Sequence, residues 1–144
     1  MYSLERRRER YSAIYTWRIL EGDAPNLTAS PIVARFHPRR GRSCIVPTVS
    51  NAPPAVIKNA RENSFAIRGP RLFNTLPPDV RNLTGCSVDT FKHALDKHLS
   101  TVPDEPLIPG LTQFRRVEGN SLCAWATYMA TQDDATDPAV AAPQ

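Results

Sequence analysis

The apolar positions between residues 3 and 21 repeat with the period of an amphipathic helix. Ser3 is suited to the N-cap of this helix, and Gly22 is suited to the position after its last turn. Trp17 and Leu20 lie beside the predicted apolar face, so we expect a second partner to cover them. The face itself consists of Leu4, Tyr11, Ile14, Tyr15 and Ile19.

Residues 87–101 have the most regular helical pattern in the chain. Ser87 is suited to the N-cap, and Asp89 stands in the first turn, where the helix dipole favours a negative charge. The apolar face consists of Val88, Phe91, Leu95 and Leu99, and Pro103 ends the helix. A shorter helix is predicted over 121–130, capped by Asn120, and a frayed polar tail begins at Thr131.

Prolines interrupt the chain between the two long predicted helices. Six of them fall within residues 23–63, which predicts an irregular, mobile arm. Residues 43–49 are the one short extended piece expected there, and Pro47 restricts it to an edge strand or a docked coil. Residues 39–42 form a basic loop within this arm.

The densest apolar stretch follows this arm. The alternation over 65–68 predicts a short strand, and Gly69-Pro70 predicts a change of direction. Pro70 also suits the first turn of a short helix that carries Leu72 and Phe73. A further single helical turn is predicted over 78–81.

These patterns predict a mainly α fold with irregular proline-rich segments, in a small, partly disordered single module. The length of 144 residues suits one domain, and the 14 prolines keep uninterrupted elements short. The residues expected to pack its core are Phe65, Leu72, Phe73, Phe91, Leu95 and Leu99. Its parts are a basic amphipathic helix (1–22), a proline-rich irregular arm (23–63), a compact tail module with the 87–101 helix (64–102), and a linker with a short helix and disordered tail (103–144).

The chain has no pattern for secretion or for a membrane span. Residues 1–10 are charged, but no apolar core follows them, and the longest apolar run, 122–126, is far shorter than the roughly 20 residues of a transmembrane helix. The three cysteines are an odd number without a C-x-x-C pair, which predicts free thiols in a reducing compartment. We therefore expect an intracellular protein, nuclear or cytoplasmic, without a membrane partner.

Charge divides the chain into two unequal halves. Residues 1–82 contain 13 Arg and 1 Lys against 6 acidic residues, for a net charge of +8, whereas residues 83–144 have a net charge of −4. Because arginine binds phosphate in a bidentate manner, the first half has the field of an anion binder. A solvated basic face that meets an acidic partner domain is the alternative. The predicted nucleic-acid contacts are Arg6, Arg7, Arg8, Arg39, Arg40 and Arg42.

Catalytic and metal-binding patterns are lacking from the sequence. It has no nucleophile elbow, phosphate loop or dinucleotide fingerprint. His93 and His98 diverge on one predicted helix, so they do not form a zinc pair. The neighbouring acids at 104–105 and 133–134 are expected to be solvated. We therefore expect no catalytic residue, metal or cofactor in this chain.

One longer pattern runs through the apolar stretch and the second helix. It reads S-F-A-I-R-G-P-R-L-F-N-T-L-P-P-D-V-R-N and then F-K-H-A-L-D-K-H-L. This pattern resembles the carboxy-terminal tail of reverse transcriptases encoded by non-LTR (LINE-type, jockey-like) retrotransposons. The W-R-I-L-E-G of the opening helix and the P-D-E-P at 103–106 extend the resemblance to about residues 3–122. The matching positions are Ser64, Phe65, Gly69, Pro70, Arg71, Leu72, Phe73, Asn74, Leu76, Pro77, Val80, Arg81, Phe91, Lys92, Leu95 and Leu99.

The resemblance implies a parent protein that copies element RNA into DNA with an endonuclease and a polymerase. The polymerase motif of that family consists of an aromatic residue, one further residue and then two aspartates. Asp133-Asp134 has Thr131 at the aromatic position, so the resemblance implies no catalysis in this chain. The chain is similar to a detached tail that contacts RNA or DNA weakly and without sequence preference, beside upstream polymerase domains. The alternative is a structural appendage whose apolar residues pack on the polymerase thumb and which binds no nucleic acid. A free-standing small enzyme is a third, poorer interpretation.

Overall fold

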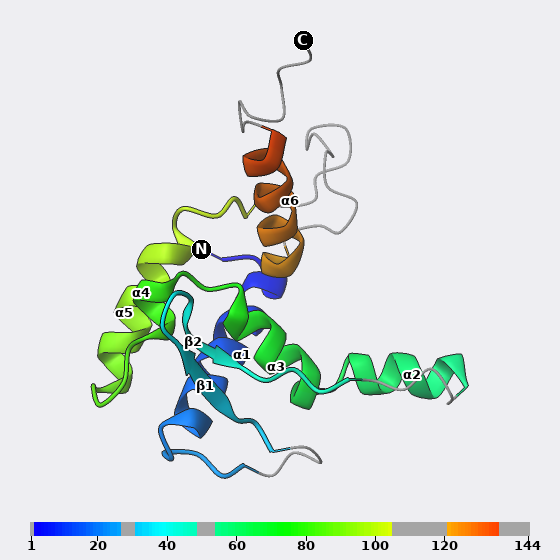
Figure 1. Cartoon of the computed structure of the whole chain (residues 1–144), viewed down its shortest axis with the longest axis horizontal. Coiled ribbons are helices and arrows are strands. Elements are labelled where there is room, and N and C mark those ends of the chain that lie inside the picture. Colours follow the sequence, from blue (N-terminus) through cyan, green and yellow to red (C-terminus); the bar gives the residue numbers. More distant parts are fainter. Residues whose placement is uncertain (1, 27–30, 49–53, 105–120, 136–144) are drawn as a thin grey trace.

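The computed structural model describes residues 2–26, 31–48, 54–104 and 121–135. These residues form six α-helices and one two-stranded antiparallel sheet (Figure 1). The helices are α1 (Leu4–Leu20), α2 (Ala55–Glu62), α3 (Phe65–Asn74), α4 (Pro78–Arg81), α5 (Val88–Leu99) and α6 (Leu122–Ala135). The strands are β1 (Ala34–His37) and β2 (Gly41–Cys44). The prediction of a mainly helical protein is thus confirmed for the described residues.

Helix α1 begins and ends as its sequence predicts, but it buries a different face. The Ser3 side chain accepts a hydrogen bond from the amide of Arg6 at 3.1 Å, and Gly22 follows the last turn with a φ of 81°. The predicted apolar face is wrong in part, because Leu4 and Tyr11 are 62% and 66% exposed. The buried face consists of Arg6, Glu9, Ala13, Ile14, Thr16, Trp17 and Ile19.

The buried face of α1 includes polar residues, so a pattern of apolar positions does not predict it. The Thr16 hydroxyl donates to the carbonyl of Ser12 at 2.8 Å, and the Trp17 indole donates to the carbonyl of Leu83 at 2.8 Å. Buried polar groups are tolerated when they are hydrogen-bonded in this way. Trp17, which the sequence places beside the predicted apolar face, is fully buried, and its hydrogen bond to Leu83 satisfies the indole N–H there.

Helix α3 replaces the strand and the break that were predicted over 65–70. The helix continues through Pro70, although a proline in a helix interior removes one hydrogen bond. Gly69 precedes it without a Cβ, which reduces the steric conflict that proline imposes on its neighbour. A Cβ at Gly69 would lie 2.8 Å from the Thr16 Oγ1, so glycine also allows α1 and α3 to pack closely.

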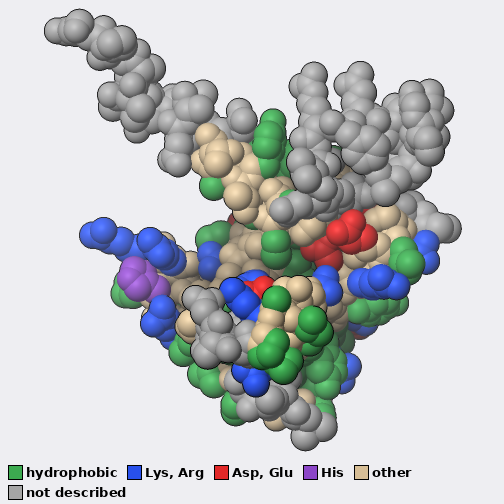
Figure 2. All heavy atoms as spheres, turned by 90° about the vertical axis from the view of Figure 1, so that its right-hand side faces the viewer, with side chains coloured by type: hydrophobic (Ala, Val, Ile, Leu, Met, Phe, Trp, Pro, Cys, Tyr) green, Lys and Arg blue, Asp and Glu red, His purple; other side chains and the backbone are tan. Residues whose placement is uncertain are grey.

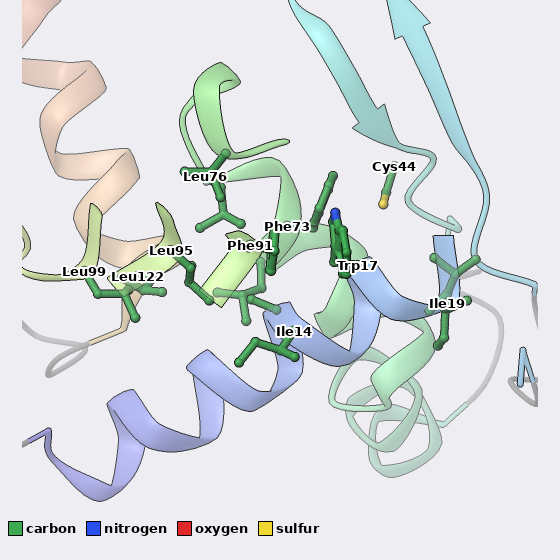
Figure 3. Packing of buried hydrophobic residues seen from close by; sticks show 14 of the residues in the cluster. Ile14, Trp17, Ile19, Cys44, Phe73, Leu76, Phe91, Leu95, Leu99 and Leu122 are labelled. Atoms are coloured by element: carbon green, nitrogen blue, oxygen red, sulfur yellow. The ribbon is translucent and has the colours of Figure 1, made fainter. Parts of the chain in front are cut away.

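The core lies where α1, α3 and α5 meet (Figure 3). The Trp17 ring stacks on the Phe91 ring, with 4.8 Å between their centroids and 12° between their planes. Five predicted packing residues, Leu72, Phe73, Phe91, Leu95 and Leu99, are confirmed as buried. The sixth, Phe65, is only partly buried, and its ring meets the Tyr15 ring edge-on at 5.4 Å.

The region predicted as an irregular arm contains regular structure. The strands β1 and β2 form a hairpin around the basic loop. The extended segment predicted over 43–49 overlaps β2 only at residues 43 and 44. Helix α2 was not predicted, and it extends away from the other elements without a buried residue (Figure 1). The hairpin depends on contacts from distant residues, which a local pattern does not contain.

The three remaining helical predictions can be compared directly. Helix α5 is capped by Ser87 as expected, and α4 is the single turn predicted over 78–81. Helix α6 starts as expected but continues to Ala135, beyond Thr131, where a frayed tail was predicted to begin. Helix α6 is therefore longer than α5. No proline interrupts it before Pro138, so the helix can continue. The predicted cap Asn120 and the tail after residue 135 lie outside the described residues.

Candidate nucleic-acid interface

The hairpin carries basic and aromatic side chains on a short antiparallel ladder. Arg35 lies opposite Ser43, and Phe36 lies opposite Arg42. The connection between the strands contains Arg39 and Arg40, and it closes at Gly41, whose φ of 74° favours glycine. Arg35, Phe36, Arg39 and Arg40 are all exposed, and Phe36 is 72% exposed. This hairpin, residues 34–44, is the basic hairpin of the following paragraphs.

Side chains from α3 and the α4 region fix the outer edge of β2. The Asn74 amide accepts from the Cys44 N–H at 2.8 Å and donates to the Cys44 carbonyl at 3.0 Å. The Asn82 Oδ1 accepts from the Arg42 N–H at 2.8 Å. The Arg81 guanidinium donates to the carbonyls of Arg42 and Arg40 at 3.3 and 3.1 Å. The basic hairpin is therefore held against the helical body from one side.

The predicted phosphate contact Arg6 is wrong. Its side chain is fully buried, and its guanidinium donates to the carbonyls of Val102 and Pro103 at 3.3 and 3.0 Å. Arginine is suited to this task because its planar group carries several donors in fixed directions. Arg6 thus joins α1 to the segment after α5 and does not reach a phosphate.

Arg42 is also committed within the protein. Its guanidinium pairs with the Glu21 carboxylate at 2.7 Å and donates to the Leu83 carbonyl at 3.2 Å. Burial opposes the ionisation of Glu21, but hydrogen bonds from Arg42, Gly85 and Thr84 outweigh it and lower the Glu21 pKa. The positive charge of Arg42 is therefore balanced locally, and its prediction as a phosphate contact is corrected.

The four remaining predicted contacts are exposed but belong to two places. Arg7 and Arg8 lie in the first half of α1, and the Arg7 Nε donates to the Tyr2 carbonyl at 3.0 Å. Arg39 and Arg40 lie on the basic hairpin, which contacts the end of α1 through Glu21. Glu21 comes thirteen residues after Arg8, a distance of about 20 Å along a helix. The six arginines therefore do not form one site.

The surface agrees with this division. Figure 2 shows basic side chains in several separate groups on the visible face, with acidic side chains among them. The net charge of the first half is thus distributed over the molecule and partly neutralised, as by the pair between Arg10 and Asp96 at 2.7 Å. A continuous basic field is not present on this face.

Two functional candidates on the basic hairpin were missed by the sequence analysis. Arg35 and Phe36 both line a shallow depression of about 480 Å³ between the hairpin, the end of α1 and the segment after α4. A basic residue next to an aromatic residue, close to the basic loop at 39–42, is the sequence signal from which they could have been predicted. The other lining residues are Ile19, Leu20, Ile32, Val33, Ala34, Arg42, Asn82 and Thr84.

Neither a metal centre nor a reactive Cys44 thiol is found within the part of the chain that the structure describes. There, no three histidine, cysteine or acidic side chains gather to hold a metal ion. The His37 Nδ1 accepts from the amides of Arg39 and Arg40 at 3.2 and 3.3 Å, so this ring shapes the hairpin connection. Burial raises the pKa of the Cys44 thiol to about 11, which makes it a poor nucleophile.

None of the described helices is both long and apolar enough to cross a membrane. Comparisons with protein-family models, with curated proteins and with solved structures find no match to this chain. Its function is therefore inferred from its own residues.

Proposed function

We propose that this chain is a non-catalytic carboxy-terminal tail of a non-LTR retrotransposon reverse transcriptase and that its basic hairpin contacts RNA or DNA. The parentage is supported by the motif positions over residues 64–99. Several of these positions have a structural role, since Leu72, Phe73 and Phe91 are buried in the core. Asn74 and Arg81, which belong to the same motif, hold the hairpin.

The observation that carries the nucleic-acid role is the exposure of Arg35, Arg39 and Arg40 on one hairpin. Among the described residues, no ion pair engages these three guanidinium groups, in contrast to those of Arg10 and Arg42. Unpaired arginines on a supported element can each bind a phosphate without first breaking an internal contact. Such contacts position a nucleic acid without reading its sequence.

The test is fluorescence anisotropy with a labelled single-stranded RNA over a salt series. Each phosphate contact to a single strand contributes about −0.7 to the log–log salt slope, so three contacts contribute about −2. Replacing Arg39 and Arg40 together with alanine is expected to flatten the slope by about 1.4. The order of preference among RNA sequences is expected to stay the same.

A matched control removes the same charge elsewhere. Arg61 and Arg68 are exposed on α2 and α3 and do not belong to the hairpin, and their double alanine variant is expected to keep the slope nearly unchanged. A similar loss in both double variants would mean that only net charge matters. No binding at low salt, or binding indifferent to salt, would falsify the nucleic-acid role.

The structural-appendage alternative needs a different surface from the one first expected. Leu95 and Leu99 cannot pack on a polymerase thumb, because this chain already buries them. The exposed apolar residues of α2, Val56 at 79% and Ile57 at 45%, are the surface that favours this alternative. In that case the isolated chain binds no RNA, and the same anisotropy series separates the two proposals.

A further inference from the structure

The depression beside the basic hairpin combines an apolar floor with one exposed aromatic ring. Its volume is about 480 Å³, and Ile19 and Ile32 are buried members of its lining. Phe36 lines the same depression, yet it is 72% exposed, the largest exposure of any aromatic residue described. An aromatic ring on a supported strand, with an open face, is a stacking platform for planar groups.

Unused hydrogen-bonding groups surround this ring. The strand register directs the peptide groups of Ala34 and Phe36 away from β2, and no hydrogen bond engages them among the described residues. Neighbouring outward peptide groups are occupied, since the Asn26 side chain bonds both the N–H and the carbonyl of Ile32 at 3.1 Å. An open edge of two residues therefore remains beside the ring.

Charge points to an anionic ligand that carries the planar group. Arg35 lines the depression, and Arg39 and Arg40 lie at the adjacent hairpin connection. The Glu21 carboxylate, which approaches the hairpin, is already paired with Arg42. A planar group joined to phosphates is the chemistry of a nucleotide.

We infer that the basic hairpin binds unpaired nucleotides, with a base stacked on Phe36 and flanking phosphates on Arg39 and Arg40. This inference rests on the proposed function and narrows it to single-stranded nucleic acid. A duplex does not satisfy the site, because its bases are stacked on one another and present no free face. The open peptide groups of Ala34 and Phe36 supply donors and acceptors for the base edge.

The experiment compares Phe36→Ala with the unaltered full chain on three labelled probes. The probes are a short uridine oligonucleotide, an abasic strand of the same length and charge, and a duplex. Loss of one stacked base is expected to weaken binding of the uridine strand roughly 5- to 150-fold. Binding of the abasic strand and of the duplex is expected to stay unchanged, because their contacts are to phosphates.

Two further variants make the result specific. Phe36→Trp is expected to retain binding of the uridine strand, since its ring also stacks. Val56→Ala, which truncates an exposed apolar residue of α2, is expected to change nothing. Circular dichroism checks that each variant folds as the original chain does.

The outcomes separate this inference from the proposed function. If Phe36→Ala leaves uridine binding unchanged, or weakens the abasic strand equally, base stacking is overturned while salt-dependent phosphate binding stands. If neither single strand binds at low salt, the proposed function fails and the inference fails with it. Weaker binding of the uridine strand alone, restored by Phe36→Trp, supports the inference.

Discussion

A carboxylate oxygen of Glu9, on α1, accepts a hydrogen bond of 2.8 Å from the backbone amide of Leu122, the first residue of α6. Both residues are buried, at 6% and 3% exposure. The other Glu9 oxygen, Oε1, has no hydrogen-bond partner among the described residues. One buried acid on the first helix thus attaches the start of the last helix.

This attachment predicts a pH-dependent stability. Burial raises the pKa of Glu9 from its ordinary 4.5 to about 7, against the lowering effects of the Leu122 amide, Arg6 and Arg68, while Glu5 adds to the rise. Between these two pH values the folded state holds a proton that the unfolded state releases, so stability falls as pH rises from about 4.5 to about 7. The contribution of Glu9 is therefore least favourable above pH 7.

Glu9→Gln is expected to remove this dependence, because an amide oxygen still accepts from Leu122 and carries no charge. Thermal unfolding by circular dichroism should give a midpoint for Glu9→Gln that rises relative to the original chain between pH 4.5 and 8. The difference between the two proteins cancels the opposite effect of His98, whose pKa is lowered by burial and by Arg6. A constant difference across this range would contradict the assignment.

The contact between Trp17 and Phe91 predicts a large loss of stability on truncation. Phe91→Ala removes a fully buried ring and leaves a cavity against the Trp17 indole, which typically costs about 3–5 kcal/mol. Lys97→Ala, an exposed change on the same helix, serves as the control and is expected to be nearly neutral. Chemical denaturation followed by circular dichroism compares them. Equal midpoints would mean that α5 does not pack through Phe91.

The close approach of Gly69 to Thr16 predicts that a single methyl group is destabilising. Gly69→Ala improves helix propensity, but its Cβ would lie 2.8 Å from the Thr16 Oγ1 and force α1 and α3 apart. We expect a net loss of about 1–3 kcal/mol. Thr16→Ala in the same chain should relieve part of it, which a double-mutant cycle measures. Additive losses would show that the two residues do not limit the approach.

The paired hydrogen bonds between Asn74 and Cys44 predict how the hairpin is anchored. Asn74→Ala leaves the Cys44 N–H and carbonyl without their partner, at a cost of about 1–3 kcal/mol. The buried Cys44 thiol should then react faster with a thiol reagent, as followed by mass spectrometry of each cysteine. Asn59→Ala, on the exposed α2, is the control. Unchanged Cys44 labelling would place the anchor elsewhere.

The elements that local sequence determined are those whose defining contacts lie within one or two helical turns. Ser3 and Ser87 cap α1 and α5 by bonding amides three residues later, so their signal is visible in the sequence. The face of α5 was predicted for the same reason, because the spacing of Phe91, Leu95 and Leu99 is itself the cause of their shared side. A two-letter pattern of apolar and polar residues is sufficient for such features.

The tertiary structure alone decided which arginines are available to a ligand. Arg6 is buried because carbonyls 96 and 97 residues later accept its hydrogen bonds, whereas Arg39 and Arg40 remain exposed on a hairpin that Asn74 and Asn82 hold. The sequence contains the same guanidinium group in each case. Its role follows from the distant acceptors that folding brings to it, because a buried charge needs such partners and an exposed one does not.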